Sequence, residues 1–149
     1  MTTVTKIMNV ISRCQGIYRA RALDCEGIQA CHHTFVLAIC RRPGMSQEEI
    51  ARDICLNKST VTRALSYLEE RGFVRREAKA GDRRALLIYP TDKMEKILPE
   101  IMRITREFND GITEGLTADE IELFHVMLAR MQERAKALAY DVERGACEE

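Results

Sequence analysis

Residues 57–63 combine short polar side chains with two cations, a set of residue types suited to binding a polyanion. Short hydroxyls and the amides at a helix N-terminus can hold phosphate oxygens. A guanidinium such as that of Arg63 can make a bidentate contact to guanine, worth about 1–3 kcal/mol of discrimination. The residues of this stretch that we predict to contact DNA are Asn57, Lys58, Ser59, Thr60, Thr62 and Arg63.

A second cationic group occupies residues 78–84. Over residues 57–84 there are eight positive and four negative side chains, although the net charge of the whole chain is zero, whereas residues 107–149 carry four positive and eleven negative ones. The field that matters for binding is local over about 8–10 Å, so the surplus predicts a polyanionic partner at this segment. Lys79 would contact phosphate, and Arg83 or Arg84 would enter the minor groove; the sequence leaves open which of the two does so.

Helix signals surround the first polar stretch. Residues 46–49 have a capping-box pattern and begin a short helix, and its first residues, Ser46 and Gln47, are predicted as further DNA contacts. Asn57 can cap the next helix, and Gly72 can end it in a left-handed conformation. The apolar face of that second helix has the spacing i, i+3, i+4, i+7 and leaves the polar residues exposed. Its members are Val61, Ala64, Leu65 and Leu68.

Two runs rich in β-forming residues, 73–77 and 85–89, predict a hairpin with residues 78–84 as its basic turn. A short helix, a turn, a second helix and a hairpin, in that order, form a winged helix-turn-helix. The predicted fold class is therefore mainly α with a small β-hairpin wing.

Apolar side chains at helical spacing predict four more helices, over residues 4–18, 35–39, 94–108 and from 117 onward. Pro99 should kink the third of these or delay its regular start. The last begins with a second capping box and has a narrow apolar seam that favours pairing with another helix.

We therefore expect a homodimer and a single domain over residues 1–149. Residues 1–28 and 108–149 would be N- and C-terminal dimerisation helices, and residues 29–107 the winged helix-turn-helix core with its connecting helix. The residues predicted at the dimer interface are Ile7, Ile11, Ile121, Phe124, Leu128, Met131 and Leu138.

Residues from about 29 to 91 resemble the MarR family of bacterial transcription regulators. Ser46-Gln47-Glu48-Glu49-Ile50-Ala51 resembles its first DNA-domain helix, and Ser59-Thr60-Val61-Thr62-Arg63 with residues 68–74 its recognition helix and exit. Asp82-Arg83-Arg84-Ala85 resembles its wing signature. The resemblance implies a homodimer joined by its first and last helices that binds a pseudo-palindromic operator, often represses, and is released by a small ligand or by thiol oxidation. It also implies that Asp82 orients a wing arginine.

The resemblance also suggests what could switch DNA binding. Cys14 and Tyr18 resemble the Cys-x-x-x-Tyr arrangement of organic-peroxide-sensing members; the alternative is that Cys14 is a small buried side chain. Family ligands commonly lie near the start of the second helix, so Arg19, His32 and His33 are candidate contacts for a small aromatic or anionic effector. A structural role is the alternative for the two histidines. We predict no metal site, because adjacent histidines on one helix diverge by about 100°.

Other function classes find little support. The sequence has no glycine-rich phosphate loop and no nucleophile elbow, so we predict neither an enzyme nor a cofactor. The alternative function is a winged-helix protein-interaction module that does not bind DNA. No membrane span or secretory signal is evident, which predicts a cytoplasmic protein, and the six cysteines are expected to be reduced and mostly small core residues. The sequence does not identify the operator, the regulated genes or the inducer, and it leaves both repression and activation open.

Overall fold

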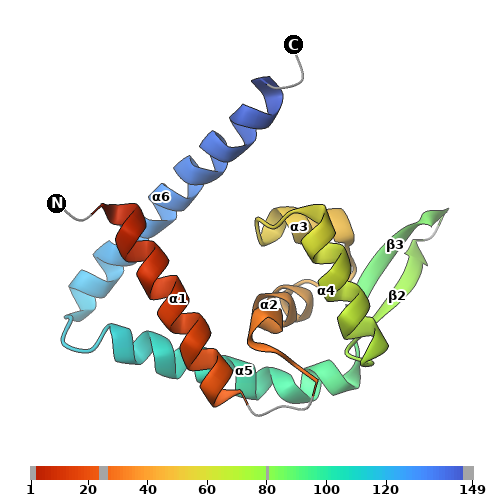
Figure 1. The fold of residues 1–149 in the computed structure, drawn as a ribbon, viewed down its shortest axis with the longest axis horizontal. Coiled ribbons are helices and arrows are strands. Elements are labelled where there is room, and N and C mark those ends of the chain that lie inside the picture. Colours follow the sequence, from red (N-terminus) through yellow and green to blue (C-terminus); the bar gives the residue numbers. More distant parts are fainter. Residues whose placement is uncertain (1–2, 24–26, 80, 146–149) are drawn as a thin grey trace. The chain divides into compact units, whose positions relative to one another are not determined.

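The computed structural model describes residues 3–23, 27–79 and 81–145 (Figure 1). The predicted contacts Lys79, Asp82, Arg83 and Arg84 lie, with residues 140–145, in helix or strand backbone whose side chains are outside this description. The elements in order are α1 (Val4–Ala22), the 3-10 helix η1 (Ala30–His32), α2 (His33–Arg41), β1 (Met45–Ser46), α3 (Gln47–Asp53), α4 (Lys58–Glu70), β2 (Val74–Lys79), β3 (Asp82–Pro90), α5 (Asp92–Ile112) and α6 (Ala118–Gly145).

The chain divides into two compact units, Met1–Phe108 and Asn109–Glu149. The first contains the winged helix-turn-helix, and the second contains α6. The predicted fold class, mainly α with a small wing, is confirmed. Within the described residues, every helix is too short or too polar to span a membrane.

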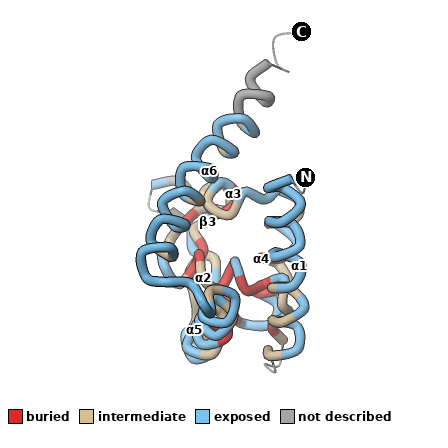
Figure 2. Tube along the Cα trace, turned by 90° about the vertical axis from the view of Figure 1, so that its left-hand side faces the viewer, coloured by how far each residue is buried: buried red, intermediate tan, exposed pale blue. Residues whose placement is uncertain are grey.

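The core of the first unit joins α2, α3, α4, the sheet and α5, where the buried stretches of Figure 2 lie. Phe35, Ile39, Ile50, Leu65 and Leu68 are fully buried there. Burying one such side chain contributes about 1.5–3 kcal/mol, so the apolar face of α4 fixes that helix firmly against its neighbours. The opposite face of α4 is thereby turned to solvent.

The wing is a three-stranded antiparallel sheet in the order β1-β3-β2. Met45 pairs with Ile88, Val74 pairs with Pro90, and the β2–β3 register shifts between Ala78 and Lys79. The predicted seven-residue turn is wrong, because cross-strand hydrogen bonds extend β2 to Lys79 and begin β3 at Asp82. The third strand, β1, was not predicted because two residues are too few to show an alternating pattern.

The helix α5 runs from Asp92 to Ile112 with Pro99 inside it. The predicted late start is wrong: Thr91 Oγ1 accepts a bond from Met94 N at 3.4 Å and donates to the carbonyl of Gly72 at 2.7 Å, so the helix is fixed from its first turn. Met94, Ile101 and Ile104 are buried on either side of the proline. Their burial offsets the roughly 3 kcal/mol cost of an interior proline.

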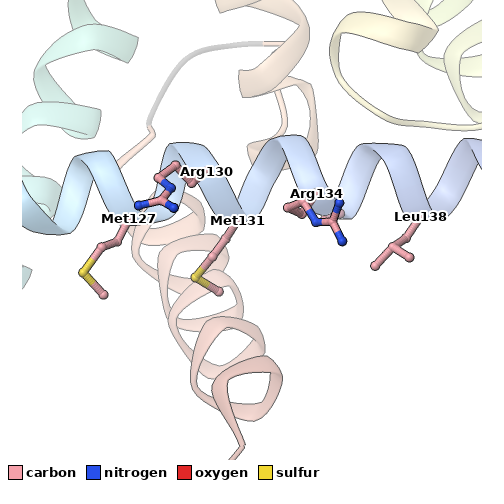
Figure 3. A pocket seen from close by; sticks show the side chains of 6 residues that line it. Met127, Arg130, Met131, Arg134 and Leu138 are labelled. Carbon is pink, nitrogen blue, oxygen red and sulfur yellow. The ribbon is translucent and has the colours of Figure 1, made fainter.

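The two terminal helices expose most of their apolar residues. α1 buries none of its side chains, and none of the described side chains of α6 is fully buried. Met127, Met131 and Leu138 project from one side of α6 in Figure 3, where they line a shallow groove flanked by Arg130 and Arg134. Contiguous exposed apolar side chains on one helix are typical of an interaction surface.

The expectation that most cysteines are core residues is wrong for those described. Cys14, Cys31 and Cys55 are exposed, and Cys40 is half-buried, where burial raises the pKa of its thiol. The reason is their position: Cys14 lies on α1, which has no buried side, and Cys55 lies in a turn. The remaining two cysteines lie outside the described residues.

Candidate nucleic-acid interface

The first helix of the helix-turn-helix motif begins with the predicted capping box. Ser46 Oγ accepts from Glu49 N at 3.2 Å, and Glu49 Oε2 accepts from Ser46 N at 2.7 Å. The bond from the Ser46 amide lowers the pKa of Glu49, which keeps the carboxylate ionised and the cap intact. Gln47, the first residue of α3, is therefore held in a fixed position.

The turn between α3 and α4 depends on a left-handed residue. Cys55 has φ of 53°, and the amide of Leu56 donates to the carbonyl of Ala51 at 3.0 Å, which closes the end of α3. A residue with a Cβ pays about 1–2 kcal/mol to adopt this conformation. The chain therefore makes the sharp turn between the two helices without a glycine at Cys55.

The N-terminus of α4 is capped by Asn57 as predicted. Asn57 Oδ1 accepts from Thr60 N at 2.8 Å and from Ser59 Oγ at 2.9 Å. Gly72 has φ of 72° just beyond the other end of the helix. The predicted contact residues share this N-terminal half, and all are exposed except Thr60, which is half-buried: Asn57, Lys58, Ser59, Thr60, Thr62 and Arg63.

Two side-chain contacts tie the start of α3 to the outer face of α4. Gln47 Nε2 donates to Thr62 Oγ1, and Lys58 Nζ lies 2.8 Å from Glu48 Oε1. The hydrogen bond from Lys58 lowers the pKa of Glu48. The contact between Glu48 and Lys58 was not predicted from the sequence, in which Glu48 stands out only as a member of the capping-box pattern. Arg63, in contrast, has no ion pair with any described residue.

The wing is anchored beside α4. Arg76 on β2 lies with its Nε 3.1 Å from Glu69 Oε2, and its Nη2 is 3.5 Å from Ser66 Oγ. Arg75 lies over the ring of Tyr89, 4.9 Å from its centroid, so the base of the hairpin is also held across the two strands. Ser46, Gln47 and the first half of α4 thus lie on elements of one unit together with the wing, as a winged helix-turn-helix requires.

Comparison with known proteins agrees with this geometry. The model of the MarR family matches residues 33–86. The structure of the transcriptional regulator SlyA is 26% identical, covers 95% of this chain and 99% of its own, and superposes with a TM-score of 0.90. That of MarR is 28% identical over 94% and 95% of the two chains, with a TM-score of 0.82. Residues 33–86, which hold the helix-turn-helix and most of the wing, thus match the MarR family, and the whole chain has the fold of its members. These matches, together with the geometry of α3, α4 and the wing, identify a DNA-binding transcription regulator rather than an enzyme, as the sequence predicts.

A more distant MarR-family regulator, from Listeria monocytogenes and complexed with 26mer DNA, shares the fold with a TM-score of 0.90. It is 21% identical, and the match covers 97% of each chain. The fold of the present chain therefore extends, as in these relatives, over nearly its whole length.

Away from the candidate interface, a buried polar group lies between α1, α2 and α5. His33 Nε2 lies 2.6 Å from Thr105 Oγ1, which itself donates to the carbonyl of Ile101 at 2.7 Å. Since the threonine proton is committed, His33 must donate from Nε2, which leaves Nδ1 as an acceptor. His33 Nδ1 and Arg19 Nε are both buried without a hydrogen-bond partner among the described residues. Burial, followed by the charge of Arg19, lowers the pKa of His33 to about 4.

His32 has a different environment from His33. Its Nδ1 accepts from Gln29 N at 3.3 Å, and its ring stacks on Tyr67 with a centroid separation of 4.6 Å. Burial lowers the pKa of His32, so it is held neutral. These contacts link the start of α2 to the end of α4, and they leave little of the His32 ring available to a ligand.

In the predicted Cys14–Tyr18 pair, the tyrosine hydroxyl is bonded to another residue. The Tyr18 hydroxyl donates to Glu107 Oε2 at 3.3 Å, and its ring lies against Phe108. Thr105 and Glu107 were missed because each meets its partner across more than seventy residues. No metal site is formed by His, Cys, Asp or Glu within the part of the chain that the structure describes.

Proposed function

We propose that this chain is a sequence-specific repressor that binds a pseudo-palindromic operator as a homodimer, with α4 in the major groove and the β2–β3 wing at the minor groove. The observation that carries the proposal is the exposed, polar and cationic N-terminal half of α4, opposite a fully buried apolar face. A helix is about 10–12 Å across and fits the major groove of about 12 Å. The DNA complex of the Listeria monocytogenes regulator supports the same use of the fold.

The contacts divide by chemistry. Hydroxyls and amides at the start of α4, with Ser46 and Lys58, are suited to phosphate, whereas Arg63 is suited to a guanine edge. Lys58 would exchange its ion pair with Glu48 for a phosphate. At the wing, Arg83 or Arg84 reaches the minor groove, Asp82 orients it, and Lys79 contacts the backbone; these four assignments rest on the sequence.

A second copy is needed for specificity. One recognition helix covers too few base pairs, and a two-fold dimer places another one helical turn away, about 34 Å. The exposed residues Ile7, Ile11, Phe124, Met131 and Leu138 on α1 and α6 support these helices as the interface, together with Ile121 and Leu128, which are half-buried. A dimer seated across an operator would exclude polymerase, which supports repression.

Release by a small effector is supported by the orphaned polar atoms at Arg19 and His33. A phenolic hydroxyl can donate to His33 Nδ1 and a carboxylate can accept from Arg19 Nε, so a hydroxylated aromatic acid carries the groups that these two atoms lack. Isothermal titration with benzoic and hydroxybenzoic acids should give heat that His33→Ala removes and His32→Ala retains if the fold is intact. Heat that neither substitution changes would contradict this site.

Thiol oxidation is the other proposed route of release. Exposed Cys14 is accessible to a peroxide, although Tyr18 is directed to Glu107. Loss of DNA binding on treatment with an organic hydroperoxide, abolished by Cys14→Ser, would support it. Equal loss from both proteins would exclude Cys14 as the sensor.

Selection of bound sequences from random DNA tests the proposal as a whole. We expect an inverted repeat whose half-sites are about 10 base pairs apart. Affinity for it should fall steeply with added salt, by roughly one unit of log–log slope for each phosphate contact. Enrichment of no sequence, with binding only to proteins, would favour the interaction-module alternative.

A further inference from the structure

The hydroxyl of Thr62 makes two hydrogen bonds within the protein. Thr62 Oγ1 donates to the carbonyl of Lys58 at 2.8 Å and accepts from Gln47 Nε2. A hydroxyl carries one proton and two lone pairs, so the proton and one lone pair are occupied. The side chain is nevertheless exposed, on the face of α4 that carries Arg63. The group of Thr62 that remains for a ligand is mainly its γ-methyl.

Gln47 fixes that arrangement from a separate helix. Because the threonine proton goes to the Lys58 carbonyl, Gln47 must supply its amide N–H rather than its carbonyl. Gln47 is the first residue of α3, which the Ser46–Glu49 capping box anchors, and a second contact between Glu48 and Lys58 joins the same two helices. A threonine in a helix ordinarily divides between two rotamers, so a donor fixed on a neighbouring helix selects one of them.

Base chemistry then limits what Thr62 can recognise. Guanine presents N7 and O6 acceptors in the major groove and adenine presents an N7 acceptor, and both need a donor that Thr62 has already committed. The group that an apolar methyl recognises is the C5-methyl of thymine, which no other DNA base carries. The remaining lone pair could accept from an adenine or cytosine amino group, which is the competing reading.

We propose that Thr62 is a specificity-determining residue that reads the C5-methyl group of one thymine per half-site through its own γ-methyl, and that Gln47 is the positioning residue that holds it in that rotamer. This inference rests on the proposed function, since it requires α4 to enter the major groove. It changes the expected role of Thr62 from phosphate contact to base reading, and that of Gln47 from direct contact to positioning.

The test replaces each thymine of the selected operator, one at a time, by deoxyuridine, which removes only the C5-methyl. With the full-length protein, one position in each half-site should lose about fourfold in affinity, the effect of one methyl group withdrawn from apolar contact. Thr62→Val, which retains a methyl and lacks the hydroxyl, should keep this sensitivity. Thr62→Ser, which retains the hydroxyl alone, should bind thymine and deoxyuridine operators equally.

Gln47→Met removes the amide donor while keeping a similar side-chain volume. It should reduce the deoxyuridine effect, which is the loss of affinity on replacing the recognised thymine by deoxyuridine. Adding Thr62→Val to it should restore the effect, because valine is held in one rotamer by the helix itself. Thr113→Ser is the matched control, since Thr113, just beyond the end of α5, makes the same type of bond to the carbonyl four residues earlier, at 2.9 Å. It should leave the effect unchanged.

Two results would overturn the inference. One is wild-type protein that binds the operator and tolerates deoxyuridine at every position. The other is a sensitivity kept by Thr62→Ser and lost by Thr62→Val, which would assign the reading to the hydroxyl. Failure to select any DNA would instead refute the proposed function, so the two failures are distinct. Unchanged thermal unfolding of the variants separates a reading defect from a folding defect.

Discussion

The proposed function gives Arg63 and Lys79 two different contributions to DNA binding. Arg63 is exposed on α4 and unpaired among the described residues, so it is available for a base edge. Arg63→Ala should relax preference at one operator position by about 1–3 kcal/mol. Lys79→Ala should weaken all sequences alike and reduce the salt slope by about one unit. Binding measurements on the operator and its single-base variants at several salt concentrations distinguish these effects; equal changes from both would contradict the division.

His33 makes a residue-scale prediction about pH. Burial lowers its pKa from 6.5 to about 4, so between these values the unfolded chain binds more protons than the folded chain. The free energy of unfolding should therefore rise as pH rises through this window and change little above it. At about 1.4 kcal/mol per pKa unit, the contribution reaches up to roughly 3 kcal/mol. Urea unfolding across this range should show a flatter pH dependence for His33→Gln.

The control for that experiment is His125→Gln, because His125 is an exposed histidine on α6. It should leave the pH dependence as in the wild-type protein. An equal slope for wild-type and His33→Gln would mean that burial does not keep His33 neutral in the folded protein.

At the scale of elements, α4 depends on its N-terminal cap. Asn57 Oδ1 is the acceptor for Thr60 N, and without it that amide at the helix end loses its partner. Asn57→Ala should lower the free energy of unfolding by about 1 kcal/mol, whereas Asn57→Asp should retain most of it. Ser59→Ala, which removes a hydroxyl but not the cap, is the control in the same urea titration. A loss as large for Ser59→Ala would show that the cap is not the cause.

How much could be predicted from the sequence differs between elements. The cap, the apolar period and the terminal glycine of α4 fall within sixteen consecutive residues, so local rules suffice to delimit it and its exposed face. β1 has only two residues, and the outer parts of β2 and β3 are held by cross-strand pairing. Local β-propensity does not predict such pairing. The Gln47–Thr62 and His33–Thr105 contacts depend on how helices pack, so no spacing in the sequence indicates them.

At the scale of the whole molecule, the terminal helices have charge that suits association. α1 carries four cations, Lys6, Arg13, Arg19 and Arg21, and no acidic residue, whereas the first two turns of α6 contain Asp119, Glu120 and Glu122. Apolar residues lie beside these charges on both helices. If a dimer packs α1 of one copy against α6 of the other, it covers this apolar surface and brings opposite charges together, which favours orientation as well as affinity.

Removal of α6 tests the dimer directly. Truncation after Gly115 should give a monomer, or an unfolded chain, by light scattering, because it removes every predicted interface residue beyond α1. Leu138→Glu in the full chain provides a milder test, since Leu138 is 65% exposed and its replacement should not disturb the core of the first unit. It should raise the dimer dissociation constant by at least tenfold, as burial of a carboxylate in an apolar contact would cost several kcal/mol. Leu86→Glu, at an exposed leucine on β3, should leave the dimer intact; a folded dimer after truncation would exclude α6 from the interface.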